Sequence, residues 1–133
     1  MTPLRVAAYV TRGDELLVFE HRDHPQAGTQ VPAGRIDPGE SLEEGLAREL
    51  DEETGIEARV VRELGRVTRD QGGEVGVHES HYFHLVTDEG RDAWEHAVHG
   101  EGDDSGMVFL RRFVPCKPLP QLTGNQGEFL YLL

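Results

Sequence analysis

The segment from Ser41 to Gly55 constrains the fold most, because it carries both a start signal and a stop signal for a helix. Ser41-Leu-Glu-Glu44 has the spacing of a capping box, in which side chains and backbone amides hydrogen-bond reciprocally in the first turn. Gly55 is suited to the left-handed conformation that ends many helices. The pattern predicts a helix from Leu42 to Thr54.

The acidic residues of this helix fall into two groups when residues are spaced by about 100° around its axis. The leucines define an apolar stripe, formed by Leu42, Leu46 and Leu50. Glu44 and Asp51 project to the opposite, solvent side. Glu49 and Glu53 border the stripe, and Glu52 lies on the same side as Glu49. A solvated acidic face would place all of these acids opposite the leucines, so the pattern argues against that alternative.

Carboxylates beside an apolar stripe lose hydration and repel one another unless a cation compensates them. Carboxylate oxygens are hard ligands that suit Mg²⁺, Mn²⁺ or Ca²⁺. A glycine-containing loop, Gly34 to Glu40, precedes the helix and can bring a backbone carbonyl close to it. Taken alone, Gly34 could equally be a simple turn residue. Together the two segments favour a divalent-cation site.

The remaining pattern predicts one mixed α/β domain over residues 1–133. Leu4–Val10 and Glu15–Arg22 are expected to form a hairpin, and His24–Glu40 a loop with a short strand at Gln30–Pro32. Further strands are expected at Glu57–Asp70, Val77–Thr87 and Met107–Cys116. Ala93–Gly106 has no sustained period and is expected to be a polar loop, and Asn125–Leu133 a short C-terminal helix.

Composition excludes some classes of partner. The formal net charge of −12 disfavours a nucleic-acid polymer, because no basic cluster is visible in the sequence. No apolar run is long enough to span a membrane, and the N-terminus lacks the pattern of a signal peptide. The single cysteine, Cys116, agrees with a reducing compartment, so we expect a cytoplasmic protein.

The segment from Gly34 to Ile56 also resembles the Nudix box, G-x5-E-x7-R-E-U-x-E-E-x-G-U, where U is a bulky aliphatic residue. Gly34, Glu40 and the run Arg48-Glu49-Leu50-Asp51-Glu52-Glu53-Thr54-Gly55-Ile56 fill every fixed position. The resemblance implies the Nudix fold, a mixed β-sheet sandwiched between α-helices (an α/β/α sandwich).

The resemblance further implies a hydrolase that uses Mg²⁺ or Mn²⁺ to cleave a pyrophosphate bond in a nucleoside diphosphate linked to another moiety. By matching positions, Glu49, Glu52 and Glu53 would be catalytic and bind metal, with the Gly34 carbonyl as a further ligand. One of these glutamates, or one from a later loop, would be the general base. Glu40 and Arg48 would brace the loop against the helix.

Several residues outside the box are weaker candidates. Glu101 and Glu95 could supply a further acid, base or metal ligand, and each could instead be a solvated loop carboxylate. Arg22 and Arg35 could contact substrate phosphates, or could be ordinary surface arginines. His78, His81 and His84 do not form a zinc motif, because on a strand His81 points away from the other two.

The sequence leaves the substrate open. Nudix subfamilies that hydrolyse ADP-ribose, dinucleoside polyphosphates, NADH or coenzyme A are associated with sequence markers outside the box, and this sequence lacks them. Their absence favours a modified nucleoside triphosphate or a nucleotide sugar as the substrate. A non-catalytic nucleotide-binding or regulatory Nudix domain is the alternative, although such domains usually have an eroded box. A Nudix-fold isomerase would require a catalytic cysteine, and Cys116 is far from the box in sequence. Homodimers are frequent among proteins resembling this one.

Overall fold

The computed structural model describes residues 2–70, 72–74, 76–98 and 106–133. Its elements, in chain order, are β1 (Leu4–Arg12), β2 (Glu15–His21), the 3-10 helix η1 (Pro25–Ala27), β3 (Ala33–Arg35), α1 (Leu42–Thr54), β4 (Arg59–Asp70), β5 (Val77–Val86), β6 (Ala93–Ala97), β7 (Val108–Pro115) and the 3-10 helix η2 (Leu130–Leu132). No helix in the described ranges is long and apolar enough to cross a membrane.

The strands form one mixed sheet in the order β4-β5-β1-β2-β7-β6, with β3 paired to β1. β1 and β5 run parallel, and the other pairs are antiparallel. β1 pairs with β2 only at Thr11 and Arg12, next to the hairpin turn. The two strands then diverge, and β3 pairs with the first half of β1 instead. This divergence places the short strand β3 beside the helix.

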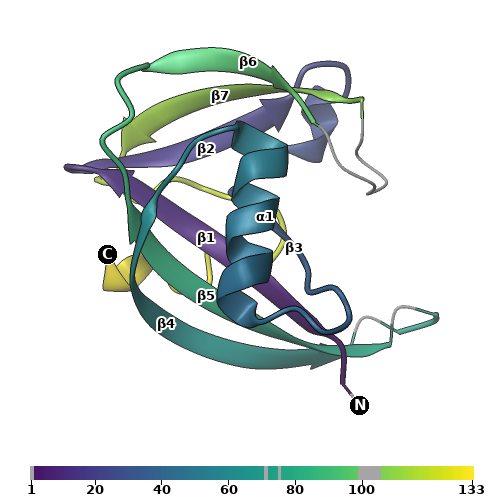
Figure 1. Cartoon of the computed structure of the whole chain (residues 1–133). Coiled ribbons are helices and arrows are strands. Elements are labelled where there is room, and N and C mark those ends of the chain that lie inside the picture. The colour runs from purple at the N-terminus through teal and green to yellow at the C-terminus, as the bar shows by residue number, and fades with distance from the viewer. Residues whose placement is uncertain (1, 71, 75, 99–105) are drawn as a thin grey trace.

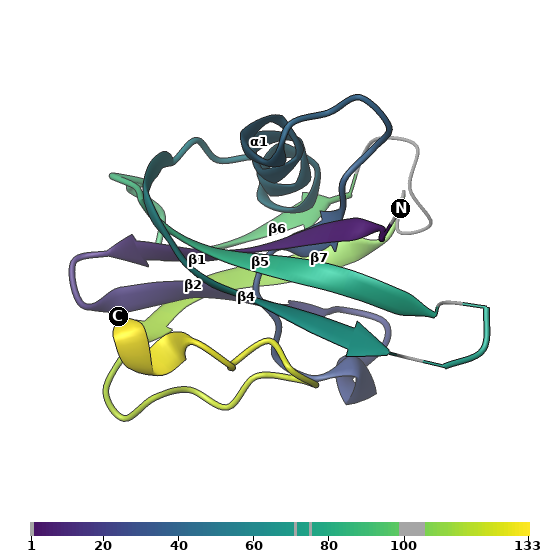
Figure 2. The same cartoon turned by 90° about the horizontal axis from the view of Figure 1, so that it is seen from below.

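The sheet is covered differently on its two faces. Helix α1 crosses one face, and the C-terminal segment with η2 covers the other, as Figures 1 and 2 show. Leu46 and Leu50 of the helix pack with Phe83 and other sheet residues in one apolar cluster. Tyr82 and Leu130 belong to a second cluster on the opposite face. The predicted mixed β-sheet with α1 on one face is therefore confirmed, while the second face is covered by a non-α segment rather than by the expected α-helix.

The helix begins and ends where its sequence signals predict. The Ser41 hydroxyl accepts a hydrogen bond from the Glu44 amide at 3.1 Å, and the Glu44 carboxylate accepts one from the Ser41 amide at 2.9 Å. Gly55 follows the last turn with φ of 73°, the left-handed conformation that glycine adopts without a Cβ clash. Both caps satisfy backbone groups that a helix end leaves unpaired.

Three local predictions need correction. Ala93–Ala97 is a strand rather than a loop, paired antiparallel with β7. The short strand in the motif loop lies at Ala33–Arg35, although Gln30 forms an isolated bridge to Phe19. The C-terminal segment forms turns and a 3-10 helix rather than an α-helix. In each case a pairing or packing partner far away in sequence determines the backbone, which local pattern does not record.

Gly65 provides a test of how closely the C-terminal segment packs on the sheet. A Cβ at Gly65 would lie 2.5 Å from Cε1 of Phe129, whose ring packs against Tyr82. We expect Gly65→Ala to lower the free energy of unfolding by about 1–3 kcal/mol, since overpacking displaces the aromatic ring. Chemical denaturation would measure the change. Gly90→Ala is the control, because a Cβ there meets no atom within 4 Å. Equal stability of both variants would contradict this packing.

Candidate metal and substrate site

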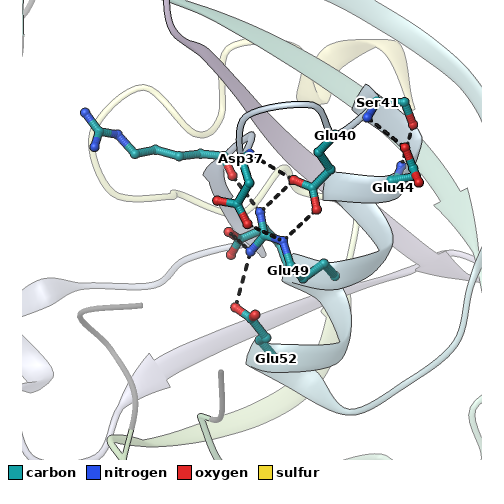
Figure 3. Close-up of polar contacts among 8 residues, drawn as sticks. Asp37, Glu40, Ser41, Glu44, Glu49 and Glu52 are labelled. Carbon is teal, nitrogen blue, oxygen red and sulfur yellow. Dashed lines mark hydrogen bonds and ion pairs between the residues drawn. The ribbon is translucent and has the colours of Figure 1, made fainter. Parts of the chain in front are cut away.

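Arg48 makes polar contacts both to the motif loop and to the helix. Figure 3 shows the acidic residues Asp37, Glu40, Glu49 and Glu52 that surround these contacts. Its Nε and NH2 groups donate to the two carboxylate oxygens of Glu40 at 2.8 and 3.0 Å. NH2 also donates to the Arg35 carbonyl at 2.8 Å, and NH1 donates to Glu49 at 2.9 Å. The Glu40 carboxylate in turn accepts from the Asp37 amide. Glu40 and Arg48 therefore form a bidentate pair, with further contacts to the motif loop and the helix around it.

Glu49 lies directly against the glycine of the motif loop. A Cβ at Gly34 would overlap the Glu49 carboxylate, so only glycine leaves room for this approach. Burial raises the pKa of Glu49 above its ordinary value of 4.5, although the hydrogen bond from Arg48 acts in the opposite direction. The charge of nearby Glu52 raises this pKa further. Glu49 is thus a desolvated carboxylate with another carboxylate close by.

Glu53 is the most buried of the three glutamates, with 6% of its surface exposed. Its Oε1 accepts a hydrogen bond from the Ala33 amide at 2.9 Å, which ties the helix to β3. Arg111 of β7 interacts electrostatically with Glu53. Burial lowers the pKa of Arg111 to about 9, and the negative charge of Glu53 opposes that shift. Glu53 therefore lies between a backbone donor and a buried cation.

Glu52 is positioned by its neighbours on both sides. Its carboxylate lies 3.4 Å from NH1 of Arg48, the nitrogen that also contacts Glu49. His96 of β6 packs behind the same turn, with its Nε2 3.1 Å from the Glu52 carbonyl. One guanidinium nitrogen therefore links two of the carboxylates and reduces their mutual repulsion.

The residues fit a divalent cation in chemical type. Three carboxylates on one side of α1 are buried or partly buried, and they lie beside β3. The carboxylate of Glu49 contacts the Cα of Gly34 in that strand. Oxygen donors of this kind suit Mg²⁺ or Mn²⁺. Within the described ranges, no three acidic, histidine or cysteine side chains already converge as a metal-ligand set. A bound cation would replace the contacts that Arg48 makes to Glu49 and Glu52.

A pocket of about 300 Å³ lies on the other side of β3. Its lining combines the strands β1, β3, β4 and β5 with the C-terminal segment: Arg5, Val6, Ala7, Ala33, Arg69, His78, Ser80, Tyr82, Thr123, Gly124, Asn125 and Gln126. We call it the β3 pocket. Because the Ala33 amide binds Glu53 while Ala33 also lines the pocket, the pocket and the carboxylates share one short strand.

The weaker sequence candidates lie at different distances from this cluster. Glu95 is exposed on β6 and alternates with Trp94 and His96, whose side chains contact backbone carbonyls at the end of α1. It therefore points away from the carboxylates. Arg22 is exposed and pairs with Asp23. Arg35 contributes its carbonyl to Arg48. Glu101 lies outside the described residues.

Sequence reasoning missed the basic residues that surround the site. Arg111 is 1% exposed, and its guanidinium nitrogens have no hydrogen-bond partner among the described residues. A signal for it exists, because Phe109, Arg111 and Phe113 alternate along one strand and so share a buried face. Arg5, Arg69 and His78 gave no comparable signal, since they come together only through strand pairing.

Comparisons with known proteins agree with this geometry. The family model described as the NUDIX domain matches residues 1–133. The NAD-capped RNA hydrolase NudC of Photobacterium profundum is 40% identical over 53 residues, which are 40% of this chain and 20% of that protein. A putative 8-oxo-dGTP diphosphatase of Bacillus subtilis is 38% identical over 56 residues, 42% of this chain and 36% of that protein. These matches thus span about a fifth to a third of the relatives' own length.

Among solved structures, the crystal structure of a UDP-X diphosphatase superposes with a TM-score of 0.69 at 20% sequence identity. The superposition covers 98% of this chain and 62% of that one. At this identity the likeness concerns the fold.

The raised pKa of Glu49 predicts how stability depends on the cation. A carboxyl whose pKa is raised on folding stabilises the fold when protonated, and this contribution is lost as pH rises through the folded-state pKa. With EDTA at pH 7, we therefore expect Glu49→Gln to increase the free energy of unfolding. The difference should vanish below the ordinary glutamate pKa, where the wild-type carboxyl is also protonated.

Saturating Mg²⁺ should reverse the order at pH 7, since ligand binding stabilises the wild type by about 2.7 kcal/mol at 100 times the dissociation constant. Thermal denaturation with EDTA and with Mg²⁺ would measure both effects, with Glu43→Gln, an exposed residue of the same helix, as control. A Glu49→Gln variant that is less stable than wild type in EDTA at pH 7 would contradict the assignment.

Proposed function

This chain belongs to the Nudix hydrolase family, and from that premise we propose that it hydrolyses a pyrophosphate bond in a nucleoside diphosphate linked to another group. We assign Mg²⁺ or Mn²⁺ to the carboxylates of Glu49, Glu52 and Glu53, with the Gly34 carbonyl as a further ligand. The observation that carries the proposal is the close contact between the Glu49 carboxylate and the Cα of Gly34, beside the partly buried Glu52 and the buried Glu53.

The cluster would serve the proposed reaction in two ways, by holding the cation and by accepting a proton. A bound divalent cation would offset the negative charge of the pyrophosphate and lower the pKa of water. A carboxylate of the cluster accepts a proton from the attacking water. The oxygen of that water forms a bond to phosphorus, and the bond from phosphorus to the leaving phosphate breaks. The burial that raises the pKa of Glu49 is the direction that favours proton acceptance near neutral pH.

Arg48 acts through its partners rather than on the substrate. Its bidentate contact with Glu40 and its contact with the Arg35 carbonyl hold the motif loop against α1. Since Gly34 lies in the strand that includes Arg35, the same contacts keep Gly34 facing Glu49. The main-chain N–H of Ala33 orients Glu53 from the other side.

We further propose that the substrate is a small nucleotide, either a modified nucleoside triphosphate or a nucleotide sugar, and that the protein is cytoplasmic. Relatives named for 8-oxo-dGTP and NAD-capped RNA support a nucleotide substrate. The β3 pocket supports it too, because about 300 Å³ is at the lower end of the range of small-molecule sites. The family resemblance also suggests a homodimer, which analytical ultracentrifugation would test.

Hydrolysis assays test the proposed reaction. Purified protein with Mg²⁺ or Mn²⁺ is incubated with nucleoside triphosphates, nucleotide sugars, ADP-ribose, dinucleoside polyphosphates and coenzyme A, and released phosphate and pyrophosphate are measured. We expect turnover of at least one substrate, and a fall in kcat/KM of at least about 100-fold in Glu52→Gln and Glu53→Gln, because each removes a charged metal ligand.

The control is Glu43→Gln, which removes an exposed carboxylate from the same helix and should retain activity within about twofold. Undiminished turnover in both Glu52→Gln and Glu53→Gln would overturn the metal assignment. Nucleotide binding without turnover of any substrate would instead favour the binding or regulatory domain.

A further inference from the structure

A row of basic residues crosses the sheet on the face opposite α1. In the strand register, Arg69 of β4 lies opposite His78 of β5, Ser80 of β5 opposite Arg5 of β1, and Arg5 opposite Arg35 of β3. Residues directly opposite each other project to the same face of a sheet. Three arginines from three strands therefore gather on one face. We call Arg5, Arg35 and Arg69 with His78 the arginine row.

The row is poorly compensated within the protein. Like charges directly opposite each other destabilise a strand pair, and Arg5 faces Arg35 in this way. Arg69 has one acidic neighbour, Glu128, whose Oε2 lies 3.3 Å from NH2. In the part of the chain that the structure describes, no ion pair is formed by Arg5 or Arg35. Such an excess of positive charge is notable in a chain with a net charge of −12.

The row also holds hydrogen-bonding groups without partners. Arg5, Arg69 and His78 line the β3 pocket, and His78 is 6% exposed. Nδ1 of His78 is buried and has no hydrogen-bond partner among the described residues. NH2 of Arg69 is also buried, and its ion pair with Glu128 lacks the alignment of a hydrogen bond. Buried polar groups of folded proteins are normally satisfied, so these two atoms are available to hydrogen-bond a ligand in the β3 pocket.

The electrostatics of His78 agree with a concentrated positive field. Burial lowers the pKa of His78, and the charges of Arg5, Arg69 and Arg35 lower it further. Arg5 also acts on the other side of β3, where its charge lowers the pKa of Glu49 against the larger effect of burial. One arginine therefore lies within electrostatic range of both the β3 pocket and the carboxylate cluster.

We propose that the arginine row binds a phosphomonoester on the substrate, separate from the pyrophosphate that is hydrolysed. A phosphate dianion has three acceptor oxygens, which matches several guanidinium forks and a neutral imidazole better than a single carboxylate does. Among the nucleotide substrates of the proposed reaction, this contact would favour those that carry such an additional phosphate. The reaction part of this inference rests on the proposed function, and the binding part does not.

Binding without catalysis tests the row directly. Metal-free protein is titrated with adenosine 3′,5′-bisphosphate, adenosine 2′,5′-bisphosphate and 5′-AMP, none of which contains a pyrophosphate. We expect one of the bisphosphates to bind at least about tenfold more tightly than 5′-AMP, because hydrogen bonds between charged groups exceed neutral ones. Its binding should also raise the pKa of His78 in an NMR titration, since a dianion offsets the three arginines.

Variants separate the row from general charge effects. Arg69→Gln should reduce the bisphosphate preference to near unity, and Arg5→Gln is a second variant in case the first fails to fold. The matched control is Arg66→Gln, an exposed arginine of the same strand opposite His81, on the other face of the sheet. Loss of the preference in the control as well as in the row variants would overturn the proposal.

A hydrolysis assay tests the arginine row independently of the binding measurement. With Mg²⁺, kcat/KM is compared for coenzyme A against dephospho-coenzyme A and for NADPH against NADH, pairs that differ in one phosphomonoester. We expect a preference of at least about tenfold for the phosphorylated member of one pair, abolished by Arg69→Gln. Tight bisphosphate binding without any hydrolysis would support the row while contradicting the proposed reaction.

Two results would refute the row. Equal binding of 5′-AMP and both bisphosphates would do so, whether or not the protein is an active hydrolase. Inorganic phosphate that binds as tightly as the bisphosphates would identify a free-phosphate site rather than a substrate subsite.

Discussion

The contact between Arg48 and Glu40 is the interaction on which the rest of the site depends. It joins a loop rich in glycine and proline, which has little regular structure of its own, to the one α-helix of the described chain. The planar guanidinium can serve two carboxylate oxygens and a backbone carbonyl at once, which an ammonium group cannot do with the same geometry. Together with the hydrogen bond from the Ala33 amide to Glu53, this connection holds Gly34 against Glu49.

The short strand β3 separates charges of opposite sign. On the helix side lie the three glutamates, and on the other side lie the arginine row and the β3 pocket. Each side is electrostatically incomplete by itself, since buried charges require compensation. A cation on one side and a phosphate on the other would complete both. Such a pair of ligands would explain how a chain with a net charge of −12 could receive the anionic substrate proposed for it.

The parts of the site that could be predicted from sequence are those encoded within a few helical turns. Capping residues and the leucine stripe located α1 to the residue, and angular position alone indicated that Glu53 would be buried while Asp51 would not. Strand β6 escaped prediction because its alternation rests on Trp94 and His96 alone, and its partner β7 is supplied later in the chain. The arginine row depends on pairing between strands that are far apart in sequence, so no local pattern could have revealed it.

A crystal soaked with Mn²⁺ would show whether the three glutamates and Gly34 form one divalent-cation site. The anomalous difference map should show a peak in contact with carboxylate oxygens of Glu49, Glu52 and Glu53 and with the Gly34 carbonyl. The Arg48 contacts to Glu49 and Glu52 should be lengthened, while its contact to Glu40 is retained. A fully occupied Mn²⁺ site elsewhere, with no peak at these carboxylates, would contradict this assignment of the cation site.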